Sequence, residues 1–119
     1  MGVDITHYVI VGIKTTDEKL HSALKLSKDQ NVYDFMDESE DVVSSYKAEE
    51  RDFTYINTDF DYCVLGIIAA KAEEESGEGI DVVDALKVYK KYKSKATEKL
   101  KKLGLSTDKI SVYIFTYYS

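Results

Sequence analysis

Two long apolar runs dominate the hydrophobic pattern of the chain and predict the central strands of a sheet. Residues 3–14 and 62–72 are rich in β-branched and other apolar side chains. Both runs are apolar at odd and at even positions, so both faces of each strand need cover. We therefore expect these two segments to be central strands.

Shorter segments predict the remaining strands. Residues 52–58 and 109–118 read as strands, and Asn57, Asp59 and Asp61 predict the turn over residues 57–61 that follows the first of them. Residues 42–47 are expected to form one further short strand. In the last segment one face carries Ile110, Val112, Ile114 and Thr116, and the other face carries Tyr113, Phe115 and Tyr117.

The clearest helix is predicted over residues 81–103. Its apolar residues recur every three or four positions, namely Val82, Leu86, Tyr89, Tyr92, Ala96, Leu100 and Leu103. Asp81 is a good N-cap residue, with Asp84 three positions later. Gly104 is placed to end the helix in a left-handed conformation, with Leu105 touching Leu100.

A shorter helix is predicted over residues 17–28, with Thr16 as its cap. Residues 29–41 fit either a loop or a short helix. The resulting order is β-α-β-β-α-β, the pattern of a ferredoxin-like α+β fold. The expected architecture is an antiparallel four-stranded sheet with two helices on one face, in a single domain covering residues 1–119. Right-handed crossovers place the first and third main strands at the centre of that sheet.

Composition supports one globular domain in a reducing compartment. The chain has 119 residues, of which 44% are hydrophobic and 32% charged. A single cysteine, Cys63, excludes an internal disulfide and fits a cytoplasmic setting. No apolar run approaches the roughly 18–20 residues that a membrane span needs, so no membrane association is expected.

Charge is distributed unevenly along the chain. Residues 29–78 contain fifteen acids and three bases, whereas residues 80–103 contain eight lysines and three acids. The formal net charge is −6. One interpretation is a solvated lysine-rich helix beside acidic loops. The other is an acidic face directed at a basic partner.

The aromatic face of the predicted sheet is a candidate for self-association. Tyr8, Tyr113, Phe115 and Tyr117 are expected on the face opposite the helices. A homodimer or a segment of the chain itself could cover this face, and so could another protein or a small ligand. Direct nucleic-acid binding is disfavoured, because the flanking Lys/Arg footprint is missing and the net charge opposes phosphate contact.

No catalytic motif is present in the chain. His7 and His21 do not form paired His-x-Ser/Thr motifs, and no phosphate-binding loop or nucleophile elbow occurs. Cys63 lies in an apolar strand, as an inert buried thiol does. Asp59 and Asp61 could hold a hard cation, but solvated turn acids explain them better. We expect no enzymatic activity, no cofactor and no metal.

Acidic residues interleaved with tyrosines mark residues 34–62 as a candidate protein-binding segment. Carboxylates steer association and pair with Arg or Lys, while tyrosine buries area with few rotatable bonds. The candidate protein-binding residues are Asp34, Asp37, Asp41, Tyr46, Tyr55, Asp59 and Asp61.

In composition the chain resembles small phage-encoded accessory proteins, a class that includes many anti-CRISPR proteins. It is acidic and Tyr-rich, has 15 lysines to one arginine, and contains no proline. The resemblance implies a non-enzymatic viral protein that acts in the host cytoplasm. It would inhibit or redirect a host defence or nucleic-acid-handling protein. The alternative is an oligomeric binder of a small ligand, such as a nucleotide signal, in a seam lined by the aromatic face. A small enzyme is the third possibility.

Overall fold

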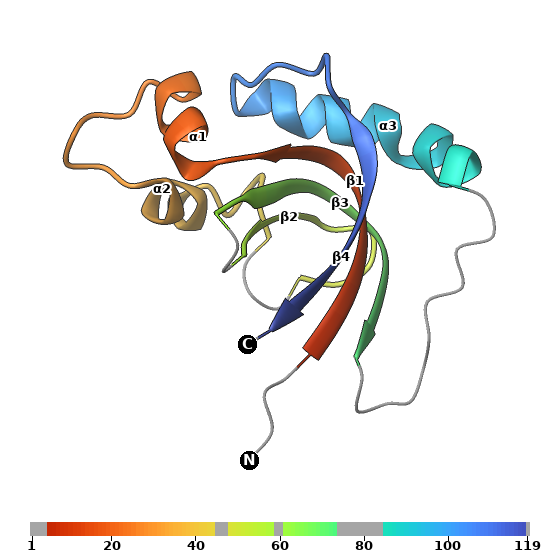
Figure 1. The fold of residues 1–119 in the computed structure, drawn as a ribbon. Coiled ribbons are helices and arrows are strands. Elements are labelled where there is room, and N and C mark those ends of the chain that lie inside the picture. Colours follow the sequence, from red (N-terminus) through yellow and green to blue (C-terminus); the bar gives the residue numbers. More distant parts are fainter. Residues whose placement is uncertain (1–4, 45–47, 59–60, 74–84, 119) are drawn as a thin grey trace.

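Four strands and three helices make up the part of the chain that the computed structural model describes. The described residues are 5–44, 48–58, 61–73 and 85–118. In chain order the elements are β1 (Ile5–Thr15), α1 (Asp17–Ala23), α2 (Val32–Glu38), β2 (Phe53–Asn57), β3 (Cys63–Glu73), α3 (Ala85–Lys102) and β4 (Ser111–Tyr118). The α+β class is therefore confirmed, with three helices where two were expected (Figure 1).

The four strands form one antiparallel sheet in the order β2-β3-β1-β4. β1 and β3 are the central strands, as their two apolar faces predicted. Their pairing runs from Thr6 opposite Glu73 to Thr15 opposite Cys63, with an irregularity between Val9 and Ile10. The edge positions fall to β2 and β4, the shorter strands (Figure 1).

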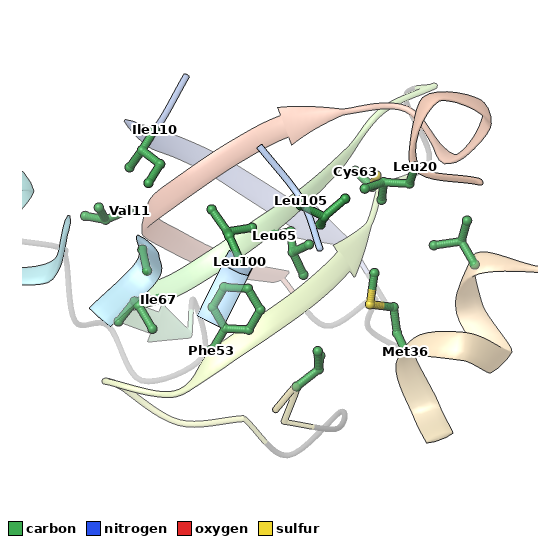
Figure 2. Packing of buried hydrophobic residues seen from close by; sticks show 13 residues of the cluster. Val11, Leu20, Met36, Phe53, Cys63, Leu65, Ile67, Leu100, Leu105 and Ile110 are labelled. Carbon is green, nitrogen blue, oxygen red and sulfur yellow. The ribbon is translucent and has the colours of Figure 1, made fainter. Parts of the chain in front are cut away.

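All three helices contribute to one apolar cluster, which we call the helix-side core (Figure 2). In the close-up, Leu100 of α3 lies beside Phe53 and Leu65 of the sheet. The buried members of this core are Val11, Leu20, Val32, Met36, Val43, Phe53, Cys63, Leu65, Ile67, Ala96, Leu100, Leu105 and Ile110. Among the described helices, none is both long enough and apolar enough to cross a bilayer.

The other face of the sheet has a smaller buried cluster, the opposite-face cluster. Its buried members are Ile10, Ala48, Val64 and Ile68. Ala48 precedes β2, so part of the chain itself packs against this face. The ammonium of Lys71 donates to the Ala48 carbonyl oxygen at 3.3 Å and helps to hold that part in place. Tyr8, Tyr113 and Phe115 pack around the cluster and are half-buried.

The observed burial along α3 differs from the predicted apolar stripe at one residue, Leu86. Ala96 and Leu100 are fully buried, as expected, but Leu86 is 59% exposed, so its expected core position is wrong. Figure 1 shows the physical reason, because the first turns of α3 extend past the bend where β1 and β3 curve away. The expected positions of Asp81, Val82 and Asp84 lie outside the described residues.

The end of α3 follows the expected Schellman motif. Gly104 has a φ of 79°, a conformation in which a side chain would be strained. The Gly104 amide donates to the Lys101 carbonyl oxygen at 2.9 Å, and the Leu105 amide donates to that of Leu100 at 3.0 Å. Leu100 and Leu105 are both buried in the helix-side core, which gives the apolar contact that accompanies this motif.

The strand predicted over residues 42–47 is not formed in its described part. Val42 and Val43 instead donate their amides to the Ser39 carbonyl oxygen, at 2.9 and 2.8 Å, and so close the turn after α2. Only Ser44 joins the sheet, through an isolated parallel bridge to Thr54 of β2. Residues 45–47 lie outside the described part.

A glycine pair lets the two central strands approach closely. Gly12 of β1 is paired with Gly66 of β3. A Cβ atom on Gly12 would collide with the Leu65 carbonyl oxygen, and one on Gly66 would collide with that of Val11. Only glycine fits both positions.

Candidate protein-binding surface

Helix α2 is oriented by two buried side chains and one capping residue. Val32 and Met36, four positions apart, are each 3% exposed and belong to the helix-side core. Asn31 caps the helix, because its Oδ1 accepts from the Asp34 amide at 2.7 Å. Its Nδ2 donates to Asp34 Oδ2 at 3.0 Å, so cap and carboxylate bond each other reciprocally. The opposite side of α2 is thereby turned to solvent.

That solvent-facing side, together with exposed acids in the turn after α2, forms the α2 surface. Tyr33 is 67% exposed and is the large aromatic side chain that α2 presents to solvent. The acids around it are exposed as well. Within the described part of the chain, no ion pair involves any of these acids. We define the α2 surface as Tyr33, Asp34, Asp37, Glu38, Glu40 and Asp41.

The lysines of α3 behave differently, because several contact groups of their own chain. Lys95 Nζ donates to the Arg51 carbonyl oxygen at 2.8 Å, and Lys102 pairs with Glu98 at 3.3 Å. Two more ammonium groups lie over tyrosine rings of the same helix, at 5.3 and 5.1 Å from the ring centroids. The lysines concerned are Lys91, Lys93, Lys95 and Lys102.

A pocket of about 240 Å³ lies between α2 and the sheet. It includes Tyr33 and Asp37 of the α2 surface, together with residues from β1, β2, β3 and β4. Its four tyrosines are Tyr8, Tyr33, Tyr55 and Tyr117. Among the described residues that line it, Asp37 is the one charged side chain.

Asp17, at the start of α1, fixes one wall of this pocket. The Tyr55 hydroxyl donates to Asp17 Oδ1 at 2.5 Å, and Asn57 Nδ2 donates to Asp17 Oδ2 at 2.6 Å. Asn57 Nδ2 also reaches the Tyr55 oxygen at 3.2 Å. Both Tyr55 and Asn57 line the pocket. One carboxylate therefore positions two pocket residues and ties α1 to β2.

The surroundings of Asp17 raise the pKa values of two side chains, the Tyr55 phenol and the Cys63 thiol. Burial, reinforced by the hydrogen bond to Asp17, raises the pKa of the Tyr55 phenol far above its ordinary value. Burial first, and then the negative charge of Asp17, raises the pKa of the Cys63 thiol to about 12. A thiol with so high a pKa carries little thiolate at neutral pH, which agrees with the inert role expected for Cys63.

The predicted binding residues are only partly brought together. Asp34, Asp37 and Asp41 share the α2 surface. Tyr55 lines the adjoining pocket, but it is half-buried and its hydroxyl is already bonded to Asp17. Asp61 is exposed in the turn between β2 and β3, with a φ of 62°. The predicted site residues Tyr46 and Asp59 lie outside the described residues.

Two residues that matter here were not among the site residues predicted from the sequence. Tyr33 stands one position before the segment singled out, and its place between Val32 and Asp34 was the available signal for an outward aromatic ring. Asp17 lies in the first turn of α1, where a carboxylate is favoured in any case, so its residue type alone carries no further signal. Its contacts reach 38 and 40 residues along the chain, and no local pattern signals them.

The four predicted self-association residues lie on two neighbouring strands. The rings of Tyr8 and Phe115 stack, with centroids 5.4 Å apart and planes inclined by 22°. Tyr113 packs around the opposite-face cluster with them, and Tyr117 joins Tyr8 in lining the pocket. All four are half-buried, which leaves part of each ring accessible.

Both histidines have structural partners. His7 Nδ1 lies 2.9 Å from Thr116 Oγ1, linking β1 to β4. His21 Nε2 lies 2.9 and 3.0 Å from the carbonyl oxygens of Ser27 and Gln30, so it carries the proton and donates to both. Across the described part of the chain, no three His, Cys, Asp or Glu side chains gather closely enough to hold a metal ion.

Comparison with known proteins gives no assignment. No protein-family model, curated protein or solved structure matches this chain.

Proposed function

We propose that this protein is a non-enzymatic binding protein whose α2 surface docks onto a basic surface of another protein. The observation that carries the proposal is the contrast between the two charged helices. Among the described residues the acids of the α2 surface form no ion pair, and only the carboxylate of Asp34 is hydrogen-bonded, to Asn31, whereas four lysines of α3 contact their own chain. Exposed charges of one sign steer a partner of the other sign. Tyr33 adds an aromatic side chain of the type enriched at interfaces.

The proposed partner is a host protein, and the proposed setting is the cytoplasm of a phage-infected cell. Host proteins that handle nucleic acid present basic surfaces shaped for phosphate. An acidic surface such as that of α2 is complementary to them, and its binding would compete with nucleic acid. Inhibition or redirection of a defence or nucleic-acid-handling factor is the proposed outcome, in line with the compositional resemblance to phage accessory proteins.

We also propose that the fold is a ferredoxin-like variant. The strand order and the antiparallel pairings agree with that arrangement. The difference is α2, which follows α1 before the chain enters β2. In this view the α2 surface is an addition to a common framework, which is where binding functions are often added.

The rival proposal, a nucleotide-binding oligomer, has less support. The pocket adjoins the aromatic face through Tyr8 and Tyr117, as that proposal needs. However, none of the described lining residues is basic, and one is a carboxylate that would repel phosphate. A homodimer through Tyr8, Tyr113, Phe115 and Tyr117 remains part of our proposal as the state without the partner, because a second copy would cover Tyr8 and Tyr117, which also line the pocket.

Charge reversal on the α2 surface tests the proposed function. Asp37→Lys with Asp41→Lys leaves the Asn31–Asp34 cap intact. Glu98→Lys with Asp108→Lys is the matched control, because it makes the same change in net charge at exposed positions of the chain beyond α2. Tagged wild-type protein and both variants are used to capture partners from a bacterial lysate, and captured proteins are identified by mass spectrometry.

We expect the wild type and the control to capture the same basic protein and the α2 variant to lose it. The association rate measured with the purified partner should then fall steeply as salt is raised. The proposal is wrong if the α2 variant still binds while Lys90→Glu with Lys93→Glu abolishes binding. That result would point to an anionic ligand on α3.

A further inference from the structure

We propose that the pocket beside α2 receives the guanidinium group of an arginine side chain from the basic partner. This inference rests on the proposed function and states which group of the partner is recognised. The pocket combines aromatic rings with one carboxylate, and this pairing is what a planar cation requires.

The aromatic part is provided by four tyrosines from four different elements. The pocket is lined by four tyrosines, Tyr8, Tyr33, Tyr55 and Tyr117, which come from β1, α2, β2 and β4. The face of an aromatic ring is negative, so a cation over it is attracted, and arginine uses this contact more often than lysine does. A guanidinium group can also stack flat on a ring, which an ammonium cannot do.

The charged part is provided by Asp37. It is the one carboxylate among the described lining residues, and no lysine, arginine or histidine accompanies it. Within the described residues it has no ion-pair partner. A carboxylate accepts two parallel hydrogen bonds from a guanidinium group, which sets its direction as well as its charge. The side-chain oxygen of Asn57 is a further acceptor, because its nitrogen already donates to Asp17.

The size of the pocket favours one side chain over a whole small molecule. Its volume is about 240 Å³, below the roughly 300–1,000 Å³ of pockets that enclose drug-sized ligands. Tyr33 and Asp37 also belong to the α2 surface, so the pocket is continuous with the acidic area proposed to meet the partner. A protein that approaches the α2 surface can therefore insert one side chain into the pocket.

A capped arginine tests this inference directly. The probe is N-acetyl-arginine methylamide, titrated into isotope-labelled protein while amide signals are followed by NMR. The matched neutral probe is the citrulline analogue, which has the same shape and no charge. We expect the arginine probe to shift signals of Tyr33, Asp37 and Thr54 in a saturable manner, and to bind at least ~10-fold more tightly than the citrulline probe.

Two variants locate the binding. Asp37→Asn keeps the shape of the side chain and removes its charge, so it should weaken the arginine probe several-fold and leave the citrulline probe unchanged. Asp41→Asn is the control, because Asp41 belongs to the α2 surface but does not line the pocket. Equal binding of the two probes, or equal losses in both variants, would overturn the inference.

The result of the probe titration can be distinguished from the result of the capture experiment that tests the proposed function. If the arginine probe fails while the captured partner still needs Asp37 and Asp41, the pocket inference is wrong and the binding function stands. If the probe binds as expected while charge reversal leaves capture intact, the pocket recognises guanidinium but the α2 surface is not the docking site, and the proposed function is wrong.

Discussion

Two leucines of the same predicted stripe should differ sharply in what they contribute to stability. Leu86 and Leu100 both lie on the apolar side of α3 by periodicity. In the structure Leu100 is fully buried between the helix and the sheet, and Leu86 is 59% exposed (Figure 2 shows Leu100). Replacing each by alanine in turn measures how far the sheet extends beneath the helix.

The expected magnitudes follow from burial. Leucine to alanine removes three carbon atoms, and about 0.8 kcal/mol per buried carbon gives about 2.4 kcal/mol of lost transfer free energy at Leu100. The cavity left inside a rigid core adds to this, so we expect Leu100→Ala to cost about 3–4 kcal/mol. At Leu86 less than half of the side chain is covered and any gap opens to water, so the cost should stay below about 1 kcal/mol.

Urea unfolding followed by circular dichroism measures both values. The midpoint should fall strongly for Leu100→Ala and slightly for Leu86→Ala, with the denaturant slope unchanged in both. Leu100→Met is the control, because it nearly conserves volume and should cost less than about 1.5 kcal/mol. Equal losses at the two leucines would refute the described placement of α3 on the sheet.

Three further expectations follow from other parts of the structure. The pKa of the Cys63 thiol is raised from 9.0 to about 12, so between these pH values the unfolded chain loses a proton that the folded chain keeps. The free energy of unfolding should therefore fall above about pH 9, by up to about 1.4 kcal/mol per pH unit. Cys63→Ala should remove this part of the pH dependence. Gly104→Val places a β-branched residue at a φ of 79° and should cost about 1 kcal/mol or more, so an unchanged melting temperature would contradict the C-cap. Light scattering at micromolar concentration should show a dimer that Tyr113→Ser with Phe115→Lys converts to a folded monomer, whereas a wild-type monomer at high concentration would exclude the homodimer.

Most of the sheet could be predicted from the sequence because strand burial leaves a local signal. A strand covered on both faces is apolar at every position, which identified β1 and β3 as central. Gly104 was predictable for a similar reason, since a glycine that follows a helical stripe marks a left-handed end. Both signals depend only on neighbours along the chain.

The features that could not be predicted depend on contacts between residues that lie far apart in the sequence. Periodicity shows which side of α3 is apolar, but not how far the sheet reaches beneath it, so Leu86 was misplaced. The short α2 has only Val32 and Met36 as buried anchors, too few to separate a helix from a loop. Asp17 is hydrogen-bonded to Tyr55 and Asn57 of β2, and no residue near Asp17 in the sequence indicates these contacts.

The way the site is held predicts how binding kinetics divide between its parts. Val32 and Met36 fix α2 in the core, and Asp17 holds the Tyr55 wall of the pocket, so little ordering remains to be done when a partner arrives. Exposed acids outside the pocket then act mainly on the association rate, through steering that salt screens. A guanidinium group enclosed by the pocket acts mainly on the dissociation rate, because its contacts form only after docking. Asp41→Asn should therefore slow association with little change in complex lifetime. Tyr33→Leu should shorten the lifetime and leave the salt dependence of association as it is in the wild type. The same change in both rates for both variants would refute this division of roles between the acids and the pocket.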